Sequence, residues 1–285
     1  MKIALVQMNS QPDRAHNLAE AARLMREAMT GRPDLIVLPE HFDWVGGTVA
    51  DKRRAADRVP GGEAYVLVQQ FAKENGVWIH AGSLMERRGH DHRVYNTTVV
   101  FNANGEQVGL YRKIHLFDIT APDGKTYAES AAVAPGRELF IYELGGYRIG
   151  CAICYDLRFS RLFDRLASET VDIFVLPAAF THQTGQAHWE VLCRARAIEF
   201  QAYFAACGQC GSYAMPNGDR RQTFGHSMLC DPWGKIVAQA DSGACVIMTE
   251  IDPVRLREVR RLIPMAEHRV LLADREVRIS TGTER

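Results

Sequence analysis

The sequence predicts an α/β protein with mixed sheets, organised as a single domain over residues 1–285. Apolar segments typical of buried strands alternate with segments of helical periodicity along most of the chain. Two connections, Asn102–Gly105 and Gly145–Gly146, carry turn signals that join neighbouring strands as hairpins. Hairpins add antiparallel pairs, so a plain doubly wound parallel sheet is disfavoured. A mixed sheet, or two sheets with helices outside, fits the pattern better.

In the first half of the chain, strands are expected where a short apolar run lies between turn or helix signals. Gly76 marks the end of a helix, since glycine commonly follows the last helical residue. The predicted elements are a strand at 3–8, a helix at 18–29, a strand at 34–40, a helix at 61–76, a strand at 77–83, and a hairpin of 94–101 with 106–113.

The second half continues the alternation and ends in a helix that Pro264 terminates. A turn at Asp231–Gly234 reverses one of its strands. The predicted elements are a hairpin within 138–154, a helix at 159–168, a strand at 172–177, a helix at 186–202, strands at 203–208, 225–230 and 244–251, and a helix at 252–262.

Composition favours a small-molecule partner over a polymer or a membrane. Lys plus Arg and Asp plus Glu number 34 each, so no overall field would attract nucleic acid or an anionic membrane surface. The N-terminal segment is interrupted by Gln7 and Asn9, which favours a strand over a signal peptide, and no apolar segment approaches the roughly 20 residues of a membrane span. Seven cysteines lie mostly in apolar runs, which predicts a reduced, cytoplasmic protein.

Three apolar strands end in a residue that can take part in catalysis: Glu40, Lys113 and Cys154. Each alone is more commonly a surface carboxylate, a surface lysine or a buried small apolar residue. Together they meet the needs of amide hydrolysis, which requires a nucleophile, a base and a positive group for the oxyanion. We expect burial to raise the pKa of Glu40 towards neutrality, while nearby Lys113 keeps the carboxyl ionised enough to accept the thiol proton.

The polarity changes abruptly along Cys154–Asp156, which predicts a sharp turn from strand to helix. Such a turn would push the thiol out of the sheet and direct the backbone amide of Tyr155 into the same pocket. Tyr155 and the Lys113 ammonium are therefore the predicted oxyanion hole.

Three motifs, LPEHF (38–42), YRKIHLFD (111–118) and CYDLRF (154–159), resemble those of the nitrilase or carbon-nitrogen hydrolase superfamily. The resemblance implies a Glu40, Lys113 and Cys154 triad, with Glu129 as a second glutamate that positions the lysine and the substrate. It also implies a four-layer αββα sandwich with two mixed sheets, no metal and no organic cofactor. A homodimer or higher homo-oligomer is implied too, with residues 252–285 as a helix and tail involved in dimerisation.

The segments 184–201, 208–211 and 225–234 resemble the Nit subgroup, which contains ω-amidase and deaminated-glutathione amidase. The resemblance implies hydrolysis of a small linear amide through a thioester acyl-enzyme, with water as the second reactant. A carboxylate on the acyl group is expected, because Arg158 and Lys125 lie near the motifs in sequence. The expected substrate-binding residues are Phe117, Arg158, Phe180, Thr181 and His188.

Two departures from the subgroup pattern leave the substrate open: Ser160–Arg161, where a proline and an acidic residue are usual, and Val270, where an arginine is usual. The main alternative is an N-carbamoyl amidohydrolase acting on amino acids or amines, followed by a nitrilase and a non-catalytic binding protein. A Cys–His hydrolase that pairs Cys154 with His182 or His188 is a further alternative.

Overall fold

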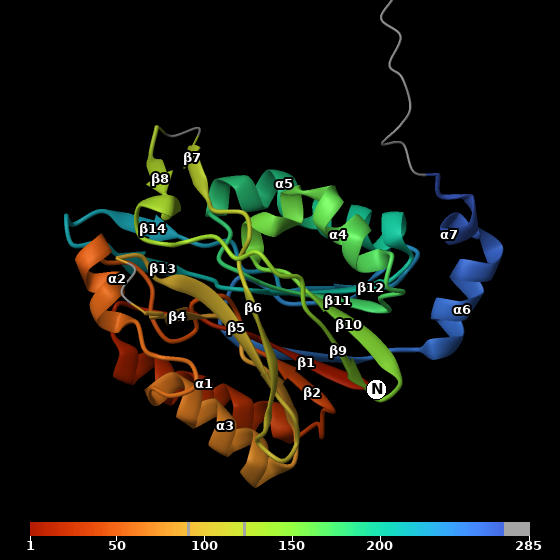
Figure 1. The fold of residues 1–285 in the computed structure, drawn as a ribbon, viewed down its shortest axis with the longest axis horizontal. Coiled ribbons are helices and arrows are strands. Elements are labelled where there is room, and N and C mark those ends of the chain that lie inside the picture. Colours follow the sequence, from red (N-terminus) through yellow and green to blue (C-terminus); the bar gives the residue numbers. More distant parts are fainter. Residues whose placement is uncertain (90–91, 122–123, 271–285) are drawn as a thin grey trace, which may run out of the picture.

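The computed structural model describes residues 1–89, 92–121 and 124–270. Two mixed β-sheets pack face to face, and helices cover the outer face of each sheet (Figure 1). The predicted four-layer αββα sandwich is thus confirmed. Among the described residues, no helix is both long and apolar enough to cross a bilayer.

The first sheet combines a parallel centre with antiparallel edges. Strand β1 runs parallel to β2 and β2 runs parallel to β3, whereas β17 and β5 are antiparallel to their neighbours. Ile3 and Leu5 of β1 face the other sheet, while Ala4 and Val6 pack with the helices, so both faces are buried. The strands are β1 (Lys2–Gln7), β2 (Leu35–Val37), β3 (Trp78–His80), β4 (Leu84–Glu86), β5 (Tyr95–Phe101), β6 (Gln107–Arg112) and β17 (Cys245–Glu250).

The second sheet has the order β16-β15-β12-β11-β10-β9, with β10, β11 and β12 parallel. Its strands are β9 (Ile141–Leu144), β10 (Tyr147–Cys151), β11 (Ile173–Ala178), β12 (Tyr203–Gly208), β15 (Met228–Cys230) and β16 (Ile236–Gln239). The strand predicted at 225–230 is only half as long, because Gly225 and His226 adopt left-handed φ angles of 73° and 55°.

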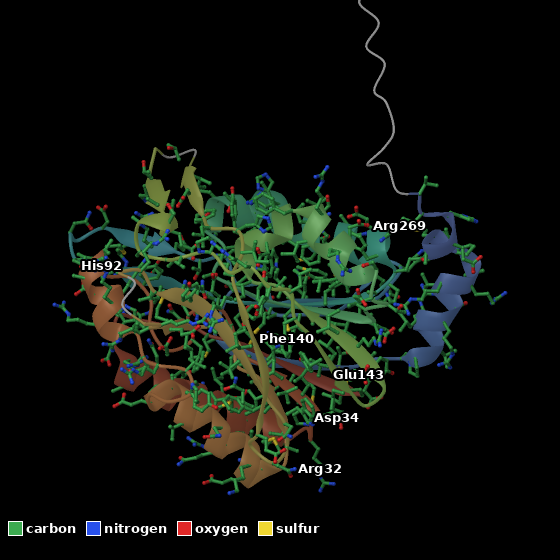
Figure 2. All side chains as sticks on the ribbon, viewed as in Figure 1. Arg32, Asp34, His92, Phe140, Glu143 and Arg269 are labelled. Carbon is green, nitrogen blue, oxygen red and sulfur yellow. The ribbon has the colours of Figure 1, made fainter. Side chains whose placement is uncertain are left out.

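Helices α1 and α3 contact each other on the outer face of the first sheet, and α4 and α5 cover the second. The described helices of these layers and of the C-terminal segment are α1 (Arg14–Met29), α3 (Glu63–Asn75), α4 (Ser160–Ala167), α5 (His182–Phe200), α6 (Pro253–Leu262) and α7 (Met265–His268). Arg269, just after α7, pairs with Asp164 of α4 at 2.8 Å and so ties the C-terminal segment to the body (Figure 2). Residues 271–285 of the expected dimerisation tail lie outside the described residues, and its role stays a prediction.

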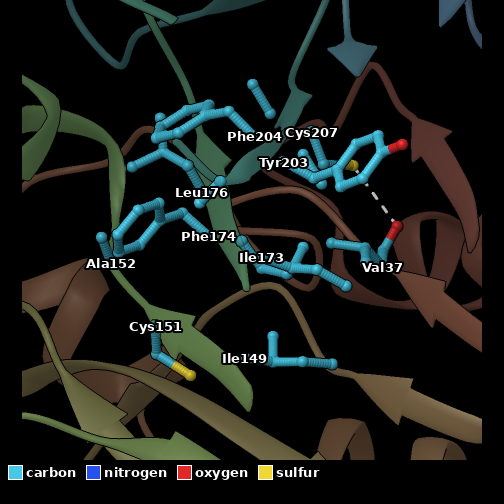
Figure 3. Close-up of a cluster of buried hydrophobic side chains, with 14 of the residues drawn as sticks. Val37, Ile149, Cys151, Ala152, Ile173, Phe174, Leu176, Tyr203, Phe204 and Cys207 are labelled. Atoms are coloured by element: carbon cyan, nitrogen blue, oxygen red, sulfur yellow. Dashed lines mark hydrogen bonds between the residues drawn. The ribbon is translucent and has the colours of Figure 1, made fainter. Parts of the chain in front are cut away.

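The second sheet buries apolar side chains on both of its faces. On the face covered by helices, Phe174 of β11 packs edge-on to Phe163 of α4 and is tilted against Phe204 of β12 (Figure 3). The Cys207 thiol donates to the backbone oxygen of Val37 at 3.3 Å, so a side chain of one sheet bonds the main chain of the other. This contact fixes the two sheets close to the end of β2.

Several short elements were not predicted from the sequence, and they lie together at one end of the sandwich (Figure 1). The loop before α2 approaches β13 closely, since a Cβ added at Gly46 would lie 3.4 Å from the ring of Tyr213. They are α2 (Val49–Ala55), the hairpin of β7 (Asp118–Thr120) and β8 (Thr126–Ala128), the hairpin of β13 (Ser212–Ala214) and β14 (Arg220–Gln222), and the 3-10 turns η1 (Glu129–Ala131) and η2 (Cys154–Arg158).

Candidate active site

The three predicted strand-end residues converge on one cavity of about 250 Å³. Glu40 follows β2 and Lys113 follows β6, both in the first sheet, whereas Cys154 follows β10 in the second. Their exposed fractions are 2%, 2% and 7%. The two sheets therefore bring a carboxylate, an ammonium and a thiol to a common, buried site.

The Lys113 ammonium lies between two carboxylates. Its Nζ donates to Oε1 of Glu40 at 3.0 Å and to Oε2 of Glu129 at 2.8 Å. Glu129, in turn η1, also accepts the backbone N–H of Phe117 at 2.7 Å. The predicted second glutamate therefore contacts the lysine directly and holds the start of the β7–β8 hairpin.

Glu40, His41 and Glu129 are the one cluster of potential metal ligands found among the described residues. The place between the two carboxylates is taken by the Lys113 ammonium, which hydrogen-bonds both. A cation there would have to displace a fixed positive charge. The two carboxylates therefore serve as partners of the Lys113 ammonium and do not fit a metal site.

Asn96 was not predicted from the sequence as a site residue, although it is fully buried in β5 beside Glu40. Its Nδ2 donates to Oε1 of Glu40 at 2.8 Å and to Oε1 of Glu129 at 3.3 Å. An asparagine inside the apolar run VYNTTVVF was the available signal, because a buried polar side chain needs a partner. Asn96 therefore orients both carboxylates.

Two side chains hold the backbone around Glu40, where His41 has a left-handed φ of 59°. Ser83 Oγ accepts the His41 N–H at 3.0 Å. Gln209 Nε2 donates to the backbone oxygen of Glu40 at 3.0 Å. These bonds from two other strand ends offset the strain of the left-handed residue and fix the direction of the carboxylate.

The predicted sharp turn at Cys154 is present, with Cys154 itself at a φ of 47°. The turn leads into 3-10 turn η2, and α4 begins only at Ser160. Asp156, fully buried, accepts the Ile153 N–H at 2.9 Å, the Tyr111 hydroxyl at 2.7 Å and the His115 N–H at 3.0 Å. Asp156 thereby fastens the strained turn to the segment that carries Lys113.

The charges of the site decide the protonation states. Burial would raise the pKa of Glu40, but Lys113 and, next, His41 bring it down to about 2. The expectation of a Glu40 pKa near neutrality was wrong, because the charges of Lys113 and His41 and the hydrogen bonds to the carboxylate together outweigh desolvation. Burial and the Glu40 charge raise the pKa of the Cys154 thiol well above its ordinary value, against the opposite effect of Lys113. The resting site therefore holds a neutral thiol beside an ionised carboxylate.

Four of the five expected substrate-binding residues line the cavity, as does Tyr155. These four are Phe117, Arg158, Phe180 and Thr181. His188 is exposed and does not line the cavity, although its Nδ1 lies 3.2 Å from Nη1 of Arg158. His182 does not line it either, so neither histidine of the Cys–His alternative faces the thiol's cavity.

The unpredicted elements supply much of the remaining wall. Lys52 comes from α2, Tyr127 from β8, Tyr213 from β13 and Arg221 from β14. Lys125 is exposed on the connection between β7 and β8 and does not line the cavity. The sequence suggested Arg158 and Lys125 as the basic residues near the substrate. In the structure, the basic residues that line the cavity with Arg158 and Lys113 are Lys52 and Arg221.

The sandwich and its buried Glu–Lys–Cys cluster are those of an enzyme class that cleaves carbon–nitrogen bonds. Residues 2–261 match the carbon-nitrogen hydrolase family, and the chain belongs to this family.

Known relatives cover almost the whole chain. A deaminated glutathione amidase of Synechocystis is 38% identical over 272 residues, covering 94% of this chain and 98% of the relative. Omega-amidase NIT2-A of Xenopus laevis is 36% identical over 271 residues, covering 94% of both chains. The crystal structure of Saccharomyces cerevisiae Nit3, a member of branch 10 of the nitrilase superfamily, superposes with a TM-score of 0.82 at 30% identity, covering 93% of this chain and 94% of that one.

Proposed function

We propose that the protein is an amidase that hydrolyses small linear amides with a carboxylate-bearing acyl group, through a thioester on Cys154. The observation that carries the proposal is the convergence of Cys154, Glu40 and Lys113 in one buried cavity. Relatives named deaminated glutathione amidase and omega-amidase, at 38% and 36% identity, support amide hydrolysis.

In the first half of the reaction, Cys154 Sγ attacks the amide carbon while its proton passes to Glu40. A Glu40 carboxyl with a pKa of about 2 is ionised at neutral pH and can accept this proton. Because the thiol pKa is raised, proton transfer accompanies the attack instead of preceding it. Glu40 then returns the proton to the departing nitrogen, the C–N bond breaks, and an amine or ammonia leaves the thioester.

In the second half, water attacks the thioester carbon and Glu40 accepts its proton. The tetrahedral intermediate collapses, the C–S bond breaks, and the proton on Glu40 returns to the sulfur as the carboxylic acid departs. The Lys113 ammonium and the Tyr155 backbone N–H are the proposed donors to the oxyanion in both halves. Glu129 keeps Lys113 protonated, since it and Glu40 outweigh burial and raise the Lys113 pKa well above its ordinary value.

Arg158 is the proposed partner of the acyl carboxylate. It lines the cavity, its guanidinium stacks over Phe180 at 5.3 Å, and its Nη1 lies 3.2 Å from Nδ1 of His188. A guanidinium without a carboxylate partner among the described residues can receive one from a ligand in bidentate geometry. Phe117 and Phe180 provide apolar walls for the methylene groups between the two ends of such a substrate.

Intact-mass detection of an acyl adduct on Cys154 tests the proposal directly. The protein is incubated with ω-amides, deaminated glutathione and N-carbamoyl acids and quenched in acid, alongside Cys154→Ala and Glu40→Gln. We expect adducts from amides in the wild type, none in Cys154→Ala, and strongly slowed acylation in Glu40→Gln. Adducts from N-carbamoyl acids alone would show that the amidase assignment is wrong, and unchanged turnover in Cys154→Ala would show that Cys154 is not the nucleophile.

We also propose that the protein forms a homodimer and works in the cytoplasm. All seven cysteines are free, which suits a reducing compartment. Val191 and Ile198 of α5 are 60% and 47% exposed, and α5 lies in the helical layer outside the second sheet (Figure 1). These apolar side chains could therefore contact a second copy of the chain. Light scattering of the wild type and of Val191→Glu tests the dimer, since a charge on that face should favour the monomer.

A further inference from the structure

His41 lines the catalytic cavity directly after Glu40, yet the proposed reaction gives it no role. In an extended strand, successive side chains point to opposite faces, so sequence neighbours do not normally share a cavity. The left-handed φ of 59° at His41 breaks this alternation, and both Glu40 and His41 line the cavity. Strained backbone of this kind is typical of positions where it places a functional side chain.

The main chain of His41 is held from two sides. Ser83 Oγ accepts its N–H at 3.0 Å, and Gln209 Nε2 lies within donating distance of its carbonyl oxygen, at 3.4 Å. Ser83 is fully buried and Gln209 is 3% exposed, so both partners are themselves fixed in the interior. The imidazole therefore enters the cavity from a backbone that the surrounding strand ends keep in place.

The two ring nitrogens of His41 have different surroundings. Nδ1 is buried and has no hydrogen-bond partner in the described residues. Nε2 also makes no hydrogen bond there, but it is not among the buried atoms, so it is open to the cavity. Nε2 lies 3.8 Å from Oε1 of Glu40, and the negative charge of that carboxylate favours a hydrogen on this nitrogen. His41 therefore presents an unused N–H donor to the cavity.

The separation of His41 and Glu40 suits a bridging water molecule. A distance of 3.8 Å is too long for a direct hydrogen bond, but one water can contact both groups across it. A ring nitrogen of His41 and one oxygen each of Glu40 and Glu129 lie within 4.8 Å of one another. Oε1 of Glu40 already accepts from Asn96 and Lys113, which leaves Oε2 to take up a proton.

The thioester must be attacked by a water that stands beside Glu40, because this carboxylate first protonates the departing amine and then deprotonates the water that replaces it. One lone pair of that water attacks the acyl carbon, and one hydrogen points to the carboxylate. Its second lone pair is then free to accept the Nε2–H of His41. Two fixed contacts orient a water molecule far better than one, and orientation is a large part of the rate.

We propose that His41 is a further catalytic residue, whose Nε2–H holds the water that hydrolyses the thioester. The water oxygen bonds to the acyl carbon, one water proton passes to Glu40, and the C–S bond breaks as that proton returns to the sulfur of Cys154. His41 keeps its own hydrogen and neither gains nor loses a proton. This inference rests on the proposed function, and it assigns His41 to the second half of the reaction.

p-Nitrophenyl acetate separates the two halves without depending on the natural substrate. Cys154 attacks its carbonyl carbon, the thiol proton passes to Glu40, and p-nitrophenolate leaves in a burst that absorbance records. Water then hydrolyses the acetyl thioester, and intact mass after an acid quench follows the loss of the acetyl group. Cys154→Ala gives the background from other nucleophiles.

Two substitutions of His41 differ in reach. His41→Asn suits a left-handed backbone but is too short to place a donor where Nε2 lies, whereas the amide nitrogen of His41→Gln reaches about that place. His16→Asn, on the exposed face of α1, is the matched control.

We expect His41→Asn to keep the burst rate within about two-fold and to slow the loss of the acetyl group at least about ten-fold. His41→Gln should hydrolyse the thioester within about three-fold of the wild type, and His16→Asn should match it. Added hydroxylamine, a stronger nucleophile than water, should raise the ratio of acetohydroxamate to acetate about ten-fold in His41→Asn relative to the wild type.

Equal slowing of burst and hydrolysis in His41→Asn would indicate a structural role and overturn the inference, as would an unchanged rate of hydrolysis. A folded His41→Gln that is as slow as His41→Asn would overturn it too. Circular dichroism verifies folding, and if His41→Gln does not fold, the product ratio of His41→Asn decides alone.

Failure of this inference is distinguishable from failure of the proposed function. If succinamate acylates Cys154 but His41→Asn loses its acetyl group as fast as the wild type, the role of His41 is wrong and the amidase stands. If His41→Asn retains the acetyl group while neither succinamate nor the other amides acylate Cys154, the amidase is wrong and the role of His41 stands. The absence of any Cys154-dependent burst would contradict both.

Discussion

Asn96 donates its side-chain amide to Oε1 of Glu40 at 2.8 Å, the same oxygen that accepts from Lys113 at 3.0 Å. The carboxylate is thus fixed by a neutral and a charged donor at once. Both donors stabilise its ionised form. The proposed base is oriented before any substrate arrives, which lowers the reorganisation needed at the moment of proton transfer.

Replacing Asn96 with leucine should therefore lower the rate and raise the pKa of Glu40. Loss of one hydrogen bond to a charged group is worth about 1.5–3 kcal/mol, or roughly 10- to 150-fold in kcat/KM. The acidic limb of the pH–rate profile should move to higher pH, because the carboxylate is then more easily protonated. Asn104→Ala, at an exposed turn position, is the control and should match the wild type. An unshifted acidic limb in Asn96→Leu would contradict this role.

Lys113→Met should destabilise the fold in a pH-dependent way. Without the ammonium, Glu40 and Glu129, with side chains 2% and 11% exposed, are left as close, uncompensated carboxylates. The folded-state pKa of Glu40 then rises above the unfolded one, so the lost stability returns as the pH falls through that value. We expect a loss of about 3–5 kcal/mol near neutral pH and a smaller loss at pH 5. Urea unfolding at neutral pH and at pH 5 measures the loss of stability, with the exposed Lys235→Met as the control. Equal losses at the two pH values would exclude the electrostatic cause.

Asp43, three residues after Glu40, should give the protein a stability that falls as the pH rises. It is fully buried, its Oδ2 pairs with Arg14 at 3.0 Å, and its Oδ1 has no partner in the described residues. Burial raises the pKa of Asp43 to about 6, although Arg14 opposes this. A folded pKa above the unfolded one contributes stability that is present below pH 3.8 and is lost as the pH rises through about 6.

Asp43→Asn should flatten this dependence. The free energy of unfolding is measured with denaturant from pH 4 to pH 7. The difference between variant and wild type should change by about 1–3 kcal/mol across this range, and the variant should gain relative stability as the pH rises. Asp219→Asn, at an exposed turn, should show no such trend. A constant difference across the range would mean that Asp43 stays ionised throughout.

Asp156→Asn should uncouple the thiol from the rest of the site. Asp156 accepts from Ile153, Tyr111 and His115, and an amide group would direct hydrogens at one or more of these donors. We expect a loss of stability of about 2–4 kcal/mol and a fall in kcat larger than the rise in KM, because the turn at Cys154 loosens. Tyr111→Phe removes one donor only and should cost about 1–2 kcal/mol. Steady-state kinetics and urea unfolding measure both, and a Tyr111→Phe effect as large as that of Asp156→Asn would contradict the shared anchor.

The sequence allowed the layers and the central residues of the site to be predicted because both depend on local patterns. Buried strands appear as apolar runs, and reactive residues at the ends of such runs gather where the strands leave the sheet. The protonation of Glu40 could not be predicted in this way. Desolvation raises its pKa whereas the charges of Lys113 and His41 lower it, and only the contacts made in the folded protein decide between these effects.

The elements missed are those that build the far wall of the cavity. Helix α2 and the hairpins β7–β8 and β13–β14 are short and largely exposed, so they bury too little apolar surface to show a period. Two local signals were nevertheless readable. Thr48 and Asp51 form a capping box at the start of α2, and Asn217–Gly218 lies between strands β13 and β14. Lys52 and Arg221 were overlooked with the elements that carry them.

Glu40 and Lys113 belong to one sheet and Cys154 to the other. The distances between the reacting groups therefore depend on how the two sheets pack together. A small sliding of one layer over the other would change the distance from sulfur to carboxylate while leaving every hydrogen bond within each layer intact. Changes of volume deep between the two sheets, for instance at Ile173 or Val37, can thus alter the turnover rate without touching the ligand. Selection on the chemistry would then act on packing residues that no inspection of the cavity wall would single out.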